Sequence, residues 1–118
     1  MRAAGAVFEQ RACAELQRAG LKLLARNYST RYGELDLVMV DDGTVVFVEV
    51  RHRLTSSCGS AAASVNASKQ AKLIRTAELW LADHPQHAHR ACRFDVVSYD
   101  GPTDRAQMRW WRGAFEAG

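Results

Sequence analysis

The stretch 33–51 constrains the fold of this chain most strongly, because it contains two apolar segments joined by Asp42-Gly43. Asp-Gly between alternating hydrophobic residues is one of the strongest short signals for a two-residue β-hairpin turn. Side chains alternate along a strand, so one face of this hairpin collects apolar residues without a polar interruption. These residues are Leu35, Leu37, Met39, Val46, Val48 and Val50. We therefore expect an antiparallel hairpin with this face in the core.

The opposite face of the hairpin carries charged residues at the end away from the turn. Counting outward from the turn places Asp36 opposite Glu49 and Glu34 opposite Arg51. Like charges at directly opposed positions destabilise a strand pair. The pairing of Asp36 with Glu49 therefore requires something that compensates the two negative charges.

Two interpretations of these acids remain open. A divalent cation such as Mg²⁺ takes carboxylate and phosphate oxygens together, and Arg51 would hold an anionic substrate beside that ion. Alternatively, the acids form a solvated surface ladder that Arg51 and Glu34 screen. Glu9, at the edge of the apolar stripe of a predicted helix, is either a further site carboxylate or a first-turn acid favoured by the helix dipole.

The remaining pattern predicts two helices and further strands around the hairpin. Apolar residues recur at helical spacing in two segments, and short apolar runs bounded by turn residues mark the strands. In chain order we expect a helix at 3–19, a strand at 21–26, a loop at 27–33, the hairpin, a mobile small-residue segment at 54–64, a helix at 65–82, a strand at 92–99 and an edge strand at 108–111. This order predicts an α/β or α+β fold with a mixed sheet.

Length and composition are typical of one globular domain. The 118 residues, 47% hydrophobic and 25% charged, suffice for a single domain that spans 1–118. A net charge of +3 permits a nucleic-acid partner without requiring one. The three cysteines are widely spaced and odd in number, which is typical of reduced thiols in a cytoplasmic protein. No apolar run approaches the roughly 18 residues that a membrane span needs, so we expect no membrane partner.

Several basic residues are candidates for contacts with nucleic acid. Two arginines are interleaved with tyrosines before the hairpin, a combination that suits phosphate and base contacts. Two lysines lie along one ridge of the second predicted helix. The candidates are Arg26, Arg31, Arg53, Lys69 and Lys72. Each is also compatible with an ordinary solvated side chain, which is the commoner case for such residues taken alone.

Taken together, the motifs resemble the uncharacterised bacterial YraN family. The matching pieces span nearly the whole chain and include Glu9, Arg26-Asn27, Gly33-Glu34-Leu35-Asp36-Leu37, Phe47-Val48-Glu49-Val50-Arg51, Lys69, Arg93-Phe94-Asp95-Val96-Val97 and Ala114-Phe115. That family is similar to the PD-(D/E)XK nuclease superfamily, which includes restriction endonucleases and archaeal Holliday-junction resolvases. The resemblance implies a restriction-endonuclease-like αβββαβ core, with a mixed sheet flanked by helices.

The resemblance also implies roles for individual residues. Asp36, Glu49 and Glu9 match the catalytic acids that hold Mg²⁺ or Mn²⁺, where the ion activates water and screens the scissile phosphate. Arg51 stands at the catalytic position that lysine usually occupies. Arginine stays protonated and cannot act as a base, although it can hold a phosphate through two hydrogen bonds. Arginine at this position is therefore more compatible with phosphate binding than with catalysis.

Three functions are compatible with the sequence. The leading hypothesis is a metal-dependent endonuclease or resolvase-like enzyme that hydrolyses DNA phosphodiesters, and the likeness to resolvases favours a homodimer. The second is a module with a nuclease fold that binds nucleic acid without cutting it. The third is an interaction protein that binds a protein partner through an exposed Trp110-Trp111 end.

Overall fold

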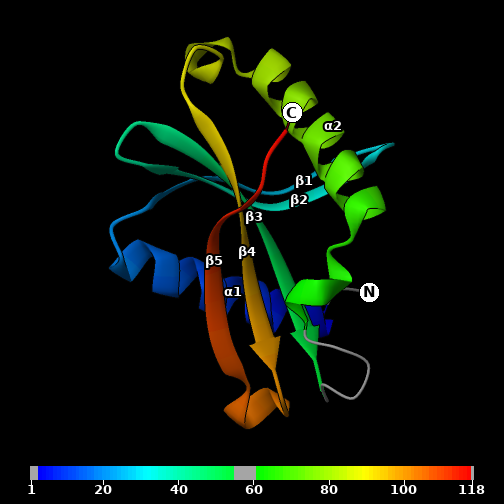
Figure 1. Cartoon of the computed structure of the whole chain (residues 1–118). Coiled ribbons are helices and arrows are strands. Elements are labelled where there is room, and N and C mark those ends of the chain that lie inside the picture. Colours follow the sequence, from blue (N-terminus) through cyan, green and yellow to red (C-terminus); the bar gives the residue numbers. More distant parts are fainter. Residues whose placement is uncertain (1–2, 55–60, 118) are drawn as a thin grey trace.

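The computed structural model describes residues 3–54 and 61–117, and its elements follow the order αβββαβ with one more strand at the end. The helices and strands are α1 (Ala3–Arg18), β1 (Lys22–Thr30), β2 (Gly33–Asp41), β3 (Thr44–Arg53), α2 (Ala67–Asp83), β4 (Cys92–Asp100) and β5 (Gln107–Phe115). The predicted mixed α/β class and αβββαβ core are confirmed (Figure 1). Within the described part of the chain, neither helix is both long and apolar enough to cross a membrane.

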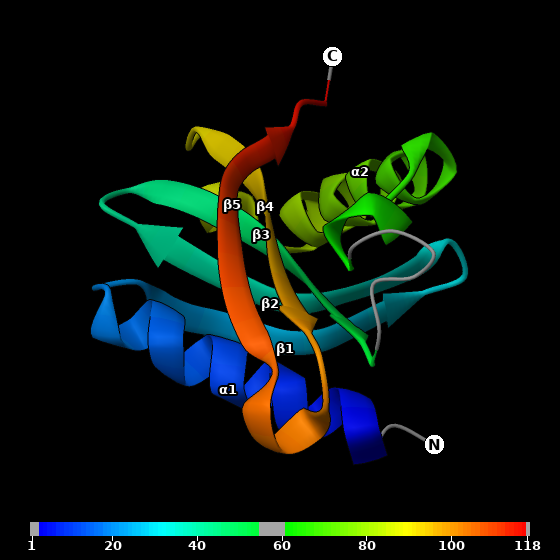
Figure 2. The same ribbon diagram turned by 60° about the horizontal axis from the view of Figure 1, so that its bottom comes forward.

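The five strands form one sheet in the order β1-β2-β3-β4-β5. Only the β3–β4 pair is parallel; the other three neighbouring pairs are antiparallel. Parallel strands need a long crossover connection, usually a helix, and α2 lies within the connection between β3 and β4. Helix α1 covers one face of the sheet and α2 the other (Figure 2).

Hydrophobic residues on both faces of the central hairpin are buried. On the α1 side the core contains Phe8, Ala12, Cys13, Leu16, Leu21, Leu37, Met39, Val46, Val48, Val97 and Tyr99. On the α2 side it contains Leu35, Val38, Val45, Phe47, Val65, Leu73, Ala77, Trp80, Phe94 and Val96. The expectation that Leu35 and Leu37 share a face is therefore wrong, because the alternation of side chains breaks at the residue between them.

The predicted hairpin turn and its register are confirmed near the turn. Asp42 and Gly43 have φ angles of +49° and +88°, as a tight type I′ turn requires. The β2–β3 ladder runs from Asp41–Thr44 to Leu37–Val48 and ends there. Beyond that point β3 turns away from β2 (Figure 1).

The expected pairings of Asp36 with Glu49 and of Glu34 with Arg51 are therefore wrong as backbone pairs. The side chain of Asp36 explains the change, because its Oδ2 accepts a hydrogen bond from the Val50 N–H group at 2.8 Å. This carboxylate oxygen takes the place that a backbone carbonyl would occupy in a continued ladder.

Three segment boundaries also differ from the prediction. The expected loop at 27–33 is wrong over its first half, because β1 continues to Thr30 and the Tyr28 hydroxyl donates to Asp83 on α2 at 2.7 Å. The last strand is longer than 108–111, and Phe115 at its end stacks on Phe94 with ring centroids 4.9 Å apart. Of the segment expected to be mobile, 55–60 lies outside the described residues, whereas Ala61 is fully buried.

Candidate metal and nucleic-acid site

Asp36 lies where β2 and β3 separate, and its side chain bridges the gap between them. The residue is 8% exposed and its carboxylate accepts the Val50 N–H bond described above. Leu35 before it packs on the α2 side and Leu37 after it on the α1 side. Since the sheet is open at this point, acidic groups from both sides of the sheet can reach Asp36.

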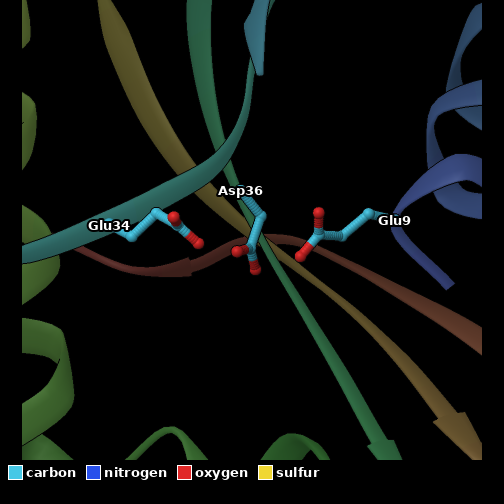
Figure 3. Close-up of side chains that lie close together, drawn as sticks. All are labelled: Glu9, Glu34 and Asp36. Atoms are coloured by element: carbon cyan, nitrogen blue, oxygen red, sulfur yellow. The ribbon is translucent and has the colours of Figure 1, made fainter. Parts of the chain in front are cut away.

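Glu9 and Glu34 approach Asp36 from different elements. One carboxylate oxygen of each of the three residues lies within 4.8 Å of the others. Figure 3 shows Glu9 reaching in from α1 and Glu34 from β2, on opposite sides of Asp36 and with their carboxyl groups turned toward it. The Ser29 hydroxyl donates to Glu34 Oε2 at 2.9 Å. Carboxylate oxygens grouped in this way are the ligand type that a hard divalent cation prefers.

Glu49 completes a group of acids around Asp36. Burial, and after it the nearby charge of Glu49, raise the pKa of Asp36 to about 8 against the opposing effect of the Val50 N–H bond. Burial also raises the pKa of Glu49, whereas a hydrogen bond with Asp36 and the charges of Arg51 and Lys69 lower it. At neutral pH the Asp36 carboxyl thus holds a proton that it shares with Glu49, and the pair titrates as a unit.

Arg51 lies beside this acid pair and faces open space on the other side. Its Nε is 3.0 Å from Glu49 Oε2, and its side chain is 27% exposed. The Nε atom is itself buried, and no acceptor among the described residues is aligned with it for a hydrogen bond. The pair is therefore held by charge rather than by a well-directed hydrogen bond, and the guanidinium remains suited to bind an anion.

Two cavities border Arg51 and Lys69. The larger, about 510 Å³, is lined by Gly5, Phe8, Val50, Arg51, His52, Arg53, Ser64 and Lys69. The smaller, about 220 Å³, is lined by Gly33, Glu34, Glu49, Arg51, Lys69, Lys72 and Leu73. The smaller cavity combines cationic side chains with Glu34 and Glu49, so an anionic ligand there would contact the candidate metal site. The larger cavity adds the cationic side chain of Arg53 to those of Arg51 and Lys69.

The structure brings most of the predicted site residues together. Glu9, Asp36, Glu49 and Arg51 meet at the gap between the strands, and Arg53, Lys69 and Lys72 line the two cavities. Arg31 lies at the exposed turn between β1 and β2, where it donates to the Tyr32 hydroxyl at 2.8 Å. Arg26 is exposed on β1, and neither cavity, as the described residues form it, includes this arginine.

Two residues near the site were missed by sequence reasoning. Glu34 was expected to face Arg51 and, with it, to screen Asp36 and Glu49. Its position two residues before Asp36 in a strand was the available signal that the two acids would lie on the same side. His52 lines the larger cavity, stacks on Phe8 at 4.1 Å and has its Nε2 2.8 Å from the Gly101 carbonyl oxygen. No spacing in the sequence indicated that α1 would cover this histidine.

The Trp110-Trp111 end is less exposed than the third hypothesis required. Trp110 packs against the α1-side core and its indole N–H donates to Asp95 Oδ2 at 2.9 Å. Only Trp111 is exposed, at 40%, and it donates to the Ser98 hydroxyl at 3.1 Å. The prediction of an exposed tryptophan pair is therefore wrong, because the Trp110 ring packs against the core.

The fold and site define a mixed α/β domain with an αβββαβ core and a buried group of acids beside cationic cavities. Comparison with known sequences then identifies its family: the chain belongs to the uncharacterised protein family UPF0102, whose profile matches residues 8–99. This match confirms the family resemblance and contains Glu9, Glu34, Asp36, Glu49 and Arg51.

Relatives in the family match this chain over most of its length. It is similar to a UPF0102 protein of Stutzerimonas stutzeri, with 50% identity over 109 residues, which cover 92% of this chain and 91% of the relative. A relative from Pseudomonas entomophila is 46% identical over 114 residues, covering 96% of this chain and 93% of the relative. A Bordetella avium relative is 52% identical over 101 residues, covering 86% of this chain and 66% of the relative.

Proposed function

We propose that this protein is a nuclease that uses Mg²⁺ or Mn²⁺ to hydrolyse DNA phosphodiesters. The observation that carries the proposal is the position of Asp36, buried where two strands separate and approached by three other carboxyl groups. Burial and the charge of Glu49 raise the pKa of Asp36 to about 8. Perturbed ionisable groups of this kind are concentrated at functional sites.

The side chains present fit a hard divalent cation. All the candidate ligands are carboxylate oxygens, from Glu9, Glu34, Asp36 and Glu49, and oxygen ligands favour Mg²⁺ and Mn²⁺ over softer metals. A bound ion would supply charge to screen a phosphate and would lower the pKa of a water molecule. It would also relieve the repulsion among four acids that now crowd one another.

The basic residues supply the rest of the chemistry. Arg51 and Lys69 border both cavities, so a phosphodiester in either cavity would lie against one or both cations. Arg51 stays protonated at any relevant pH, and its role is therefore to bind and orient the phosphate rather than to accept a proton. Asp36 must lose its proton before it can hold a metal ion with full charge.

A cleavage screen tests this proposal. Labelled branched and linear DNAs are incubated with wild type and with Asp36→Asn, each with Mg²⁺ or Mn²⁺. Asp104→Asn serves as the matched control, because Asp104 is exposed in the short turn before β5. We expect products from wild type and from the control and none from Asp36→Asn. Equal product from all three proteins would place the activity outside this site.

A second function, binding of nucleic acid without cleavage, is favoured by the ion pair of Arg51 with Glu49 at 3.0 Å. The arginine neutralises an acid that a metal ion would otherwise engage. Arg51→Lys separates the two functions, since lysine is a compact cation that leaves more room beside Glu49.

We expect Arg51→Lys to raise cleavage and to leave DNA affinity nearly unchanged. If Arg51 instead clamps the transition-state phosphate, activity should fall by about 1.5–3 kcal/mol of transition-state stabilisation. If wild type and Arg51→Lys both bind DNA and neither cuts it, the protein is a binding module and not a nuclease.

A further inference from the structure

The N-terminal half of α2 carries three cations spaced three residues apart. They are Lys69, Lys72 and Arg75, and the acids of this helix, Glu78 and Asp83, all follow them. The first turn of the helix adds partial positive charge from its backbone N–H groups, of which that of Lys69 donates to the Asn66 side chain at 3.0 Å. Residues three apart lie about 4.5 Å apart along the helix axis, and each is displaced around the axis from the one before it. The three side chains therefore form an oblique row on the helix surface.

At its far end this row of cations meets the turn between β1 and β2. The guanidinium of Arg75 lies over the Tyr32 ring at 5.1 Å, and that of Arg31 lies 5.0 Å from the same ring. The Tyr32 hydroxyl accepts a hydrogen bond from Arg31 at 2.8 Å. The turn lies next to α2, because a carbon added at Gly33 would be in ordinary contact with Thr76 Oγ1, at 3.5 Å.

At its near end the same row borders the acid site. Lys69 and Lys72 line the smaller cavity together with Glu34, Glu49 and Arg51. Lys69 also lowers the pKa of Glu49 through its charge. A continuous series of cationic side chains therefore leads from the candidate metal site, over α2, to the β1–β2 turn.

We propose that Lys69, Lys72, Arg75 and Arg31 form a phosphate track that holds one strand of the nucleic-acid substrate on one side of the cleavage position. This inference rests on the proposed nuclease function and adds the path of the substrate. Six helical residues span about 9 Å, whereas successive nucleotides of a stacked strand rise about 3.4 Å. The track therefore accommodates roughly three nucleotides. A strand that extends fewer nucleotides than this from the cleavage position should not reach Arg75 and Arg31.

Tyr32 is a positioning residue in this arrangement. Its ring and hydroxyl keep the two guanidinium groups together, so the far end of the track is formed before the strand arrives. Tyr32→Phe keeps the ring but removes the bond to Arg31. We expect about threefold weaker binding with an unchanged salt dependence, because the number of phosphate contacts stays the same.

Salt-dependent binding tests the track without any need for cleavage. The affinity of fluorescein-labelled single-stranded DNA of 4, 8 and 12 nucleotides is measured by fluorescence anisotropy between 50 and 200 mM salt, with EDTA present. Loss of one phosphate contact should reduce the slope of log affinity against log salt by about 0.7 for single strands. We expect this reduction for Arg75→Ala and Arg31→Ala with the 8-mer and the 12-mer, which are both longer than the track.

Arg105→Ala is the matched control, because it removes the same charge from an exposed turn at the opposite end of the molecule from α2 (Figure 1). It should keep the wild-type slope. The track is wrong if Arg75→Ala also keeps that slope while Lys69→Ala/Lys72→Ala flattens it. The nuclease function would still stand in that case if DNA cleavage depends on Asp36. If wild type binds none of these single strands, the track is wrong, and the cleavage screen with branched and linear DNAs decides the nuclease function separately.

Discussion

Asp36 and Asp95 are two aspartates in the interior of the same sheet, and their surroundings are opposite. Asp95 is fully buried on β4, where it accepts hydrogen bonds from the Arg93 guanidinium, the Trp110 indole and the Gly113 backbone N–H at 2.9–3.3 Å. Asp36 accepts a backbone hydrogen bond from Val50 and lies among the carboxyl groups of neighbouring acids.

The difference separates a structural acid from a candidate site acid. The donors around Asp95 balance its charge and hold the irregular pairing between β4 and β5. The surroundings of Asp36 raise its pKa, which lowers stability unless a cation or a proton is present. Residues retained in a destabilising environment commonly serve function, because activity and stability oppose each other at such positions.

The largest expected effect is the loss of Asp95. Asp95→Ala leaves the Arg93 guanidinium and the Trp110 N–H without their buried acceptor, although Arg93 keeps its ion pair with Asp41 at 3.0 Å. We therefore expect a loss of about 3 kcal/mol, at the lower end of the cost of breaking a buried pair. Urea unfolding followed by circular dichroism measures the change. A loss below about 1 kcal/mol would mean that Asp95 does not hold β5 in place.

Asp36→Asn should act in the opposite direction and stabilise the protein in the absence of metal ions. Asparagine can still accept the Val50 N–H bond but carries no charge beside Glu49. We expect a gain of roughly 1–3 kcal/mol at pH 8, given that one pKa unit corresponds to about 1.4 kcal/mol. Destabilisation of the same size would show that Asp36, like Asp95, serves the fold.

Stability should fall with rising pH because of Asp36. Its pKa is 3.8 in an unperturbed state and about 8 in the fold, so between these values the folded protein binds a proton that the unfolded chain has released. The free energy of unfolding should therefore decrease by up to about 1.4 kcal/mol per pH unit from about pH 5 to 8 and level off above.

The control for this slope is Asp36→Asn, in which this part of the pH dependence disappears. Parallel stability curves for the two proteins from pH 5 to 8 would mean that Asp36 is ionised throughout. Its surroundings would then balance its charge as those of Asp95 do.

The contrast between the two regions also shows what the sequence could predict. The hairpin was predictable because the Asp42-Gly43 turn and the apolar alternation agree, and the turn fixes the register near it. The proximity of Asp36 to Glu49 followed from that register, although the two strands separate before reaching them. The separation depends on a side chain–backbone bond from Val50 to Asp36, which leaves no pattern along the chain.

The role of Asp95 and the approach of Glu9 to Glu34 depend on contacts between distant segments. Gly113 reaches Asp95 from 18 residues away in the chain, and Glu9 comes from a helix whose orientation only packing decides. Hydrophobic periodicity predicts that such a helix exists and which face it buries. It does not determine which residues of another element this face meets.

Calorimetric titration with Mn²⁺ tests the central claim, that the acids around Asp36 hold a divalent cation. Wild type and Asp36→Asn are titrated at pH 7 in two buffers that differ in their enthalpy of ionisation. We expect weak binding to wild type with release of close to one proton, because Asp36 must ionise when the metal binds, and no binding at this site in Asp36→Asn. Equal affinity in the two proteins, or binding to wild type without proton release, would contradict the claim.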